Sequence, residues 1–242
     1  AAMDIAGWDL FSKMSRKPLY QMLGLKWESM PLTDYTIGLD TAENMVAKLQ
    51  AHPWPIYKIK ISTPDDIDLL RNLRAHTFAP FRIDVNEGWT LEQARSIIPE
   101  LQQLNVTLIE QPLHRDEYEA MKELTAYSPI PLYADESCRT EDDVKKCSGS
   151  FHGINIKLTK CGGITPALRM IKEARTLGMK VMMGSMNEST LGSAAIANML
   201  PLLDEVDADG PLLLKEDIAT GLSYDNGVIG LSGMHGLGVR MK

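Results

Sequence analysis

The sequence predicts an α/β protein of the (β/α)8-type barrel class. The chain of 242 residues contains eight short β-rich segments at near-even spacing, and amphipathic helical stretches separate most of them. A single barrel domain has about this length. Alternating strands and helices imply parallel pairing with right-handed crossovers. A doubly wound open sheet is the alternative, but no glycine-rich GxGxxG turn follows the first segment.

The predicted strands are short, and each ends close to a polar residue or a turn. In chain order they are Tyr35–Leu39, Ile56–Ile61, Phe81–Val85, Thr107–Glu110, Leu132–Asp135, Gly153–Leu158, Lys180–Met183 and Glu205–Ala208. After the last of them we expect no clear helix, and the glycine-rich tail predicts short strands and turns.

The helical stretches between the strands carry recognisable start signals. Thr63, Thr90 and Thr140 open sequences that resemble capping boxes. In Pro166–Leu177 a preceding threonine is expected to cap a proline at the first helical position. Pro99 lies inside the third stretch, so that helix should kink or start late. The first residues, AAMDIAGWDLFSKM, predict an amphipathic helix without a lead-in, so we expect part of the protein to lie upstream.

Composition excludes several classes of function. The formal net charge of −7 argues against nucleic-acid binding, and no apolar run reaches the ~18 residues of a membrane span. The three cysteines, Cys138, Cys147 and Cys161, form no CxxC motif. They predict neither a disulfide framework nor a zinc site, and they favour a reducing, cytoplasmic location.

Acidic residues end three successive predicted strands: Asp84, Glu110 and Asp135. The C-terminal ends of barrel strands face the active site, so the three carboxylates should converge. At ~4 Å and an effective dielectric constant of ~20, each pair would repel by about 4 kcal/mol, which favours a bound cation. Oxygen ligands alone suit Mg²⁺ or Mn²⁺ better than zinc. Taken singly, each carboxylate could instead cap a helix or pair with a basic neighbour.

Three lysines lie on predicted strands. Lys58 and Lys60 share one face of the second strand, beside the carboxylates, and Lys157 lies on the sixth strand, across the barrel. A neighbouring ammonium group or a metal ion lowers the pKa of a lysine, which can then act as a general base. Two lysines on opposite walls, with a metal that stabilises an enediolate, predict racemisation or epimerisation. An ion-pair network is the alternative.

These motifs together resemble the enolase superfamily, specifically its muconate-lactonizing-enzyme-like subgroup. The matching motifs, from about Trp8 to the C-terminus, are Lys58-Ile59-Lys60, Asp84-Val85-Asn86, Glu110-Gln111-Pro112, Asp135-Glu136-Ser137, and Lys157 followed by Cys161-Gly162-Gly163. The resemblance implies a modified (β/α)7β barrel with only a remnant of an N-terminal α+β capping domain.

The resemblance also assigns roles to the residues. Asp84, Glu110 and Asp135 would bind one Mg²⁺ per subunit, and Lys60 and Lys157 would be the acid/base pair. Lys58 would orient the substrate carboxylate and lower the pKa of Lys60.

The eighth strand is similar to the DxD element of dipeptide epimerases, in which Asp207 and Asp209 would bind the α-ammonium of a dipeptide. A solvated acidic turn is the alternative. The resemblance further implies that the dipeptide site is lined by Thr36, Ser185, Met186 and Asn187. It implies epimerisation at the α-carbon of the dipeptide's C-terminal residue, with L-Ala-D/L-Glu from peptidoglycan recycling as the expected substrate.

The expected domains are residues 1–30, a remnant of the capping domain; residues 31–214, the catalytic barrel; and residues 215–242, which would return to the capping domain. Alternatives within the superfamily are N-acylamino-acid racemase, o-succinylbenzoate synthase and muconate cycloisomerase, whose substrates lack a free ammonium group. A non-catalytic metal-binding barrel and a Schiff-base aldolase are further alternatives. The expected partner is a small-molecule dipeptide, with no nucleic acid or membrane, and a homo-oligomer stays open.

Overall fold

The computed structural model describes residues 1–242. Eight strands form one sheet and are hydrogen-bonded in chain order, β1 to β8. They are β1 (Tyr35–Ile37), β2 (Tyr57–Lys60), β3 (Phe81–Asp84), β4 (Val106–Glu110), β5 (Leu132–Ala134), β6 (Gly153–Ile156), β7 (Lys180–Gly184) and β8 (Glu205–Asp207). All eight predicted strands are confirmed, and their ends differ by one or two residues.

The chain divides into two compact units. Unit 1 contains residues Ala1–Thr33, Arg139–Glu141 and Asn155–Lys242, and unit 2 contains Asp34–Cys138 and Asp142–Ile154. Unit 2 therefore holds β1 to β5 and the start of β6, whereas β7 and β8 belong to unit 1. The predicted boundaries after residues 30 and 214 stay predictions.

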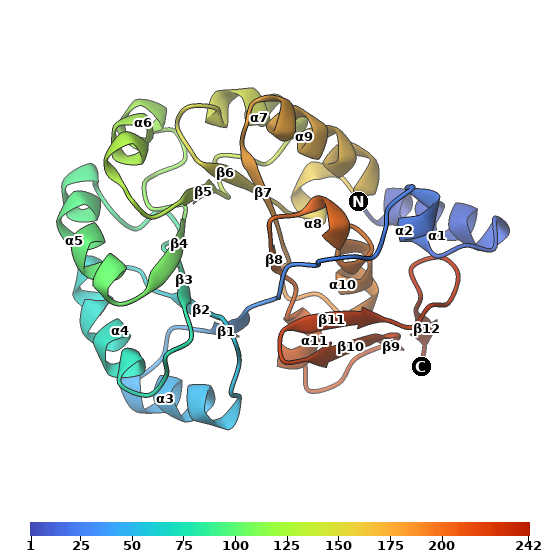
Figure 1. Ribbon diagram of the computed structural model, residues 1–242, viewed down its shortest axis with the longest axis horizontal. Coiled ribbons are helices and arrows are strands. Elements are labelled where there is room, and N and C mark those ends of the chain that lie inside the picture. Colours follow the sequence, from blue (N-terminus) through green and yellow to red (C-terminus); the bar gives the residue numbers. More distant parts are fainter. The chain divides into compact units, whose positions relative to one another are not determined.

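In unit 2 the helices follow the strands one by one and lie along one side of them (Figure 1). They are α3 (Ala42–Ala51), α4 (Ile67–Arg74), α5 (Leu91–Gln103) and α6 (Tyr118–Tyr127), with α7 (Glu141–Cys147) after β5. The Thr63 and Thr90 capping boxes are confirmed, at a short 3-10 turn (Pro64–Asp66) and at α5. Pro99 lies inside α5, which starts at Leu91 and not late.

Strand β3 is covered on both faces, as expected for a parallel strand in an α/β fold. All four residues of β3 are buried, including Arg82, whose Nη1 lies 2.9 Å from the buried Asp34 Oδ2. The register pairs Lys60 with Asp84 and Asp84 with Glu110. The parallel register thus brings the polar C-terminal ends of β2, β3 and β4 to the same edge.

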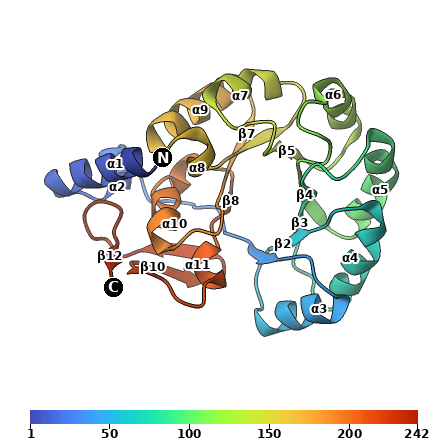
Figure 2. The same cartoon turned by 180° about the vertical axis from the view of Figure 1, so that it is seen from behind.

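In unit 1, helices α8 to α10 lie along one side of β7 and β8 (Figure 2), and the chain ends in two small antiparallel pairs. The helices are α1 (Ala2–Met14), α2 (Leu19–Met22), α8 (Leu158–Cys161), α9 (Ile164–Thr176), α10 (Thr190–Ala197) and α11 (Gly210–Leu213), with a 3-10 turn at Leu200–Leu202. Strands β10 (Leu222–Asp225) and β11 (Val228–Leu231) form a hairpin, and β9 (Ala219–Thr220) pairs with β12 (Arg240–Met241). The tail thus consists of short strands as predicted, but a short helix, α11, precedes them.

One predicted helix start is wrong. Helix α9 begins at Ile164, after Gly163, and Thr165 is therefore inside the helix and not its cap. The Thr165 hydroxyl accepts a hydrogen bond from Trp8 Nε1 (2.9 Å), and its backbone N–H donates to Asp4 Oδ2 (3.0 Å). Contacts with α1, distant in sequence, therefore satisfy the groups that a local cap would have used.

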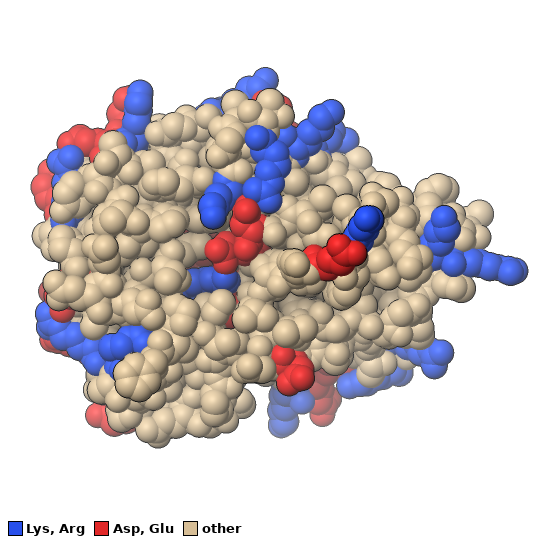
Figure 3. Space-filling model, in the orientation of Figure 1, with Lys and Arg blue, Asp and Glu red and all other residues tan.

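No helix in the structure combines the length and the apolar character that a membrane span requires. On the face of the molecule shown in Figure 3, basic and acidic side chains are both present, and no continuous basic area covers it.

His152 gives unit 2 a pH-dependent contact at the start of β6. Its Nδ1 accepts a hydrogen bond from Leu132 N (3.1 Å), which requires that nitrogen to be unprotonated. Burial lowers the pKa of the half-buried His152. The stabilisation is therefore fully present above the unfolded-state pKa of ~6.5 and is lost as the pH falls through the lowered folded-state value. Urea unfolding at pH 7.5 and 5.5 should show this loss.

The matched variant for that measurement is His152→Asn, whose amide oxygen can accept the same hydrogen bond without titrating. We expect its unfolding free energy to fall less than that of the unmodified protein between the two pH values. An equal change of the unfolding free energy in both proteins would show that His152 contributes nothing to the pH dependence of stability. His76→Asn, at an exposed position, serves as the control.

Candidate active site

Three carboxylates lie at or just beyond the C-terminal ends of adjacent strands in unit 2. Asp84 ends β3, Glu110 ends β4, and Asp135 directly follows β5. Each is only 1% exposed. Asp84 and Glu110 are also direct neighbours in the strand register. Buried acidic residues are rare without partners, so their clustering at one edge indicates a functional site.

Two lysines from β2 contact these carboxylates. Lys58 Nζ lies 3.2 Å from Asp84 Oδ2 and 2.7 Å from Glu110 Oε2, and the side chain is 4% exposed. Lys60 Nζ lies 3.2 Å from the same Asp84 oxygen and donates to Asn86 Oδ1 at 3.1 Å. The Lys60 side chain is 42% exposed. The structure therefore confirms that both lysines lie beside the carboxylates, with Lys58 between two of them and Lys60 accessible to a ligand.

The donor set of this edge fits a hard divalent cation, but no three His, Cys, Asp or Glu side chains are arranged to hold a metal ion. The Lys58 ammonium group lies between Asp84 and Glu110 and supplies positive charge there. The available ligands are carboxylate oxygens, which Mg²⁺ prefers. The three carboxylates thus fit Mg²⁺ by the chemistry of their oxygen atoms.

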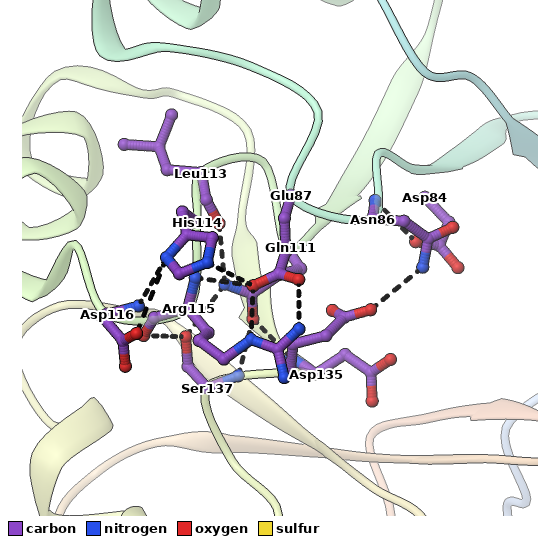
Figure 4. Close-up of polar contacts among 11 residues, drawn as sticks. Asp84, Asn86, Glu87, Gln111, Leu113, His114, Arg115, Asp116, Asp135 and Ser137 are labelled. Carbon is purple, nitrogen blue, oxygen red and sulfur yellow. Dashed lines mark hydrogen bonds and ion pairs between the residues drawn. The ribbon is translucent and has the colours of Figure 1, made fainter.

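Gln111 holds the backbone beside the third carboxylate (Figure 4). Its Oε1 accepts from the N–H groups of Asp135 and Ser137, both at 3.0 Å, and its Nε2 donates to Ser137 Oγ at 2.9 Å and to Leu113 O at 3.0 Å. Gln111 is fully buried and has a left-handed φ of 39°. Such a backbone conformation costs about 1–3 kcal/mol, so these hydrogen bonds hold a strained residue in place.

We expect Gln111→Ala to lower the free energy of unfolding by about 2–4 kcal/mol, because it leaves buried N–H and C=O groups of the β4 and β5 loops without partners. Chemical denaturation measures this loss. Gln103→Ala is the matched control, at an exposed position of α5, and should change stability by less than about 0.5 kcal/mol. A Gln111→Ala protein as stable as the control would show that the network is not a structural support.

A second polar group braces the loop after β3. Arg115 donates to both Glu87 oxygens, at 2.8 and 2.5 Å, and its backbone N–H donates to Glu87 Oε1 at 2.7 Å. Burial raises the pKa of Glu87, but the hydrogen bonds from Arg115 outweigh burial and lower it overall. Asn86 Nδ2 donates to Glu136 Oε1 at 3.1 Å, so Asn86 contacts both Lys60 and Glu136. Burial, and next the neighbouring Asp135, raise the pKa of Glu136.

Thr36 lies on β1, beside Lys58 in the strand register of unit 2. It is partly exposed, and its backbone oxygen accepts a hydrogen bond from Lys48 Nζ at 2.9 Å. The register thus places Thr36 beside Lys58, and its part in lining the dipeptide site stays a prediction.

The other predicted site residues belong to unit 1. Lys157 follows β6 directly, one residue beyond the strand's end, and is 7% exposed. Its backbone oxygen accepts from Lys160 N and Cys161 N, the first turn of α8. Ser185 is partly exposed, and Met186 and Asn187 are exposed in the loop after β7. The exposed loop residues are free to contact a ligand.

The two aspartates of the DxD element are buried. Asp207 ends β8 and is 4% exposed, and Asp209 precedes α11 and is 2% exposed. The interpretation of this element as a solvated acidic turn is therefore wrong. A buried carboxylate pair on one short segment is suited to bind a cationic group.

Sequence reasoning missed Glu188, in the loop after β7. Burial raises the pKa of its carboxyl group, Asp207 raises it further, and Lys157 lowers it, so Glu188 belongs to the same charged environment. A Cβ on Gly210 would lie 2.5 Å from the Glu188 backbone oxygen, so the loops after β7 and β8 touch. The glycine in Gly210-Pro211 was the only sequence signal of this close approach.

Comparisons with known proteins define the class. The model of the family described as enolase C-terminal domain-like matches residues 40–242. The chain therefore belongs to this family, and its eight parallel strands have the family's barrel-type fold.

Three individual proteins are similar to this chain. A protein of Flavobacterium johnsoniae named L-Ala-D/L-amino acid epimerase is 50% identical over 240 residues, which are 99% of this chain and 71% of the relative. An L-Ala-D/L-Glu epimerase of Bacteroides thetaiotaomicron is 38% identical, over 99% of this chain and 63% of its own length. The solved dipeptide epimerase of Cytophaga hutchinsonii, complexed with Mg and the dipeptide D-Ala-L-Val, is 31% identical with a TM-score of 0.92, over 98% of this chain and 68% of its own. These relatives are isomerases that act on amino acid derivatives.

Proposed function

We propose that the protein is a dipeptide epimerase that inverts the α-carbon of the C-terminal residue of a dipeptide, with L-Ala-D/L-Glu as the expected substrate. The observation that carries the proposal is the pair of β2 lysines in contact with buried carboxylates, one lysine enclosed and the other accessible. The names of the relatives support the same substrate class. The reaction would belong to cytoplasmic recycling of cell-wall peptides.

Asp84, Glu110 and Asp135 are proposed to hold one Mg²⁺, in agreement with their oxygen-only donor set. When bound, this ion would supply a Lewis acid that stabilises negative charge on the substrate carboxylate. Lys58, already between two of these carboxylates, is proposed to orient the substrate carboxylate by its positive charge. Gln111 would keep the backbone of Asp135 in position through its hydrogen bond to Asp135 N.

Lys60 and Lys157 are proposed to act on opposite faces of the α-carbon. Lys60 ends β2 and Lys157 directly follows β6, the two positions at which the resemblance to the enolase superfamily implies the acid/base pair. One neutral amine takes the α-proton, the C–H electron pair moves into the enediolate of the substrate, and the other ammonium returns a proton to the opposite face. The net result is inversion of the configuration at the α-carbon. Asn86 would hold Lys60 on the correct side through its 3.1 Å contact.

Asp207 and Asp209 are proposed to bind the α-ammonium group of the dipeptide, because two buried carboxylates stabilise a cation and not a neutral acyl group. Thr36, Ser185, Met186 and Asn187 are proposed to contact the rest of the dipeptide. A substrate without the ammonium would leave this pair of carboxylates without its cation, which disfavours N-acylamino-acid racemase, o-succinylbenzoate synthase and muconate cycloisomerase activities.

The test is a screen of L-Ala-L-Xaa dipeptides and N-acetyl amino acids with Mg²⁺, followed by chiral chromatography of the products. We expect formation of the L-D epimer from one or more dipeptides and slower or no reaction of the N-acetyl compounds. Turnover of N-acetyl amino acids alone would contradict the dipeptide proposal, and no turnover of either set would favour a non-catalytic barrel.

A further inference from the structure

The two peptide groups between Asp207, at the end of β8, and Asp209, just beyond it, are hydrogen-bonded by side chains from two other segments of unit 1. Ala208 N donates to Thr33 Oγ1 at 2.9 Å, across 175 residues of sequence. The Tyr224 hydroxyl donates to Ala208 O at 2.8 Å. The N–H bond belongs to the peptide plane between Asp207 and Ala208, and the C=O bond to the plane between Ala208 and Asp209. Because peptide units are planar, fixing both bonds orients both aspartate backbones.

The two holding residues are tied to each other through the β10–β11 hairpin. Tyr224 lies on β10, opposite Ile229 of β11. Thr33 N donates to the backbone oxygen of Gly227, in the turn of the same hairpin, at 2.9 Å. Asn226 and Gly227 both have positive φ, 47° and 83°, as a tight Asn-Gly hairpin turn requires. The hairpin thus anchors the β8 end directly through Tyr224 and indirectly through Thr33.

Burial stabilises the hydrogen bonds of Thr33 and Tyr224 to Ala208. Thr33 and Ala208 are fully buried, and water therefore cannot replace either hydrogen bond without cost. Burial raises the pKa of the Tyr224 hydroxyl far above its usual value, so the group stays a donor at any physiological pH. β8 itself pairs with β7 through backbone hydrogen bonds, and Thr33 forms a parallel bridge with Val206 of β8.

We propose that Tyr224 and Thr33 are positioning residues that set the separation and direction of Asp207 and Asp209, and that the C-terminal hairpin thereby determines selectivity for a ligand with a free ammonium group. This inference rests on the proposed dipeptide epimerase function. Loosening either peptide plane lets the carboxylates turn apart. The contribution of the ammonium to binding then falls, while contacts with the rest of the ligand are unchanged.

The experiment compares two ligands that differ only in the ammonium group. One is the L-Ala dipeptide that the unmodified protein epimerises fastest, and the other is its des-amino analogue, a propanoyl amino acid, used as a competitive inhibitor. Tyr224→Phe removes the donor, and Thr33→Val removes the acceptor. Thr33→Ser keeps the acceptor as the conservative rescue. Tyr127→Phe is the control. Tyr127 lies at the end of α6, distant in sequence from β8 and the hairpin, and its hydroxyl also donates a hydrogen bond to a backbone oxygen, that of Arg95, at 3.2 Å.

We expect Tyr224→Phe and Thr33→Val each to raise KM for the dipeptide about tenfold, the effect of one lost positioning hydrogen bond, with a smaller change in kcat. The inhibition constant of the des-amino analogue should change less than twofold. Thr33→Ser and Tyr127→Phe should behave as the unmodified protein does. If one variant does not fold, as judged by circular dichroism, the other carries the same comparison.

Equal weakening of both ligands would overturn the inference, because it would mean that the two residues only support the fold. Unchanged KM values for the dipeptide would overturn it as well. Failure of the unmodified protein to epimerise any dipeptide is a separate result, which removes the proposed function itself and with it the ligand that the inference requires.

Discussion

Replacing Lys60 with alanine is expected to lower kcat for dipeptide epimerisation by about 10²- to 10⁴-fold, the usual contribution of a general acid–base group. Lys60 is the accessible member of the β2 pair, and its Nζ contacts Asp84 and Asn86. Its ion pair is partly solvated, and Asp84 keeps the contact with Lys58, so the unfolding free energy should change by less than about 1 kcal/mol. Steady-state kinetics and chemical denaturation on the same sample separate the two effects.

Lys180→Ala is the control for Lys60→Ala, because Lys180 is an exposed lysine at the N-terminal end of β7. Barrel active sites form at the opposite, C-terminal ends of the strands, so kcat should be unchanged. A Lys60→Ala protein that retains kcat within about tenfold of the unmodified value would remove Lys60 from the chemical step.

Replacing Lys58 with methionine is expected to have the largest effect on stability, a loss of about 3–5 kcal/mol in the free energy of unfolding. The variant keeps the volume of the side chain but removes the ammonium group from between Asp84 and Glu110, both 1% exposed. Two buried carboxylates then face each other across a few ångströms, where their repulsion is strong.

The effect of Mg²⁺ on Lys58→Met tests whether lost positive charge is the cause of the instability. If the same carboxylates can bind Mg²⁺, adding the ion should raise the melting temperature of Lys58→Met more than that of the unmodified protein, because the ion replaces the missing positive charge. Thermal unfolding with and without Mg²⁺ measures the difference, and Lys180→Met is the control. A variant that loses less than about 1 kcal/mol, or equal stabilisation of both proteins by Mg²⁺, would contradict this account of the Lys58 environment.

Strand order and the main charged residues could be predicted because they depend on patterns that are local in sequence. The eight β-rich segments and the spacing of Asp84, Glu110 and Asp135 follow the repeat of a strand–helix unit, and parallel pairing then aligns the strand ends. The alternation Lys58–Lys60 likewise follows from the two-residue period of a strand. For these features the local sequence pattern and the tertiary fold place the same residues at the same strand positions.

The features that could not be predicted depend on contacts between distant segments. Thr165 looked like a helix cap, but Trp8 and Asp4 of α1 satisfy its polar groups inside the helix. The position of the Lys58 ammonium between two carboxylates, and the four hydrogen bonds of Gln111, depend on side-chain directions that sequence spacing does not specify. The glycine-rich composition of the tail likewise gave no sign that the Tyr224 hydroxyl donates a hydrogen bond to Ala208 O.

The most direct test of the central claim is α-proton exchange measured separately for the two epimers of one dipeptide. Each epimer is incubated in deuterated water with Mg²⁺ and followed by proton NMR, using the unmodified protein, Lys60→Ala and Lys157→Ala. Two lysines acting on opposite faces predict that each variant slows inversion by about 10²- to 10⁴-fold. Each should also lose exchange of one epimer and keep exchange of the other, with opposite preferences. Loss of exchange from both epimers in one variant, with no effect in the other, would contradict the two-lysine account.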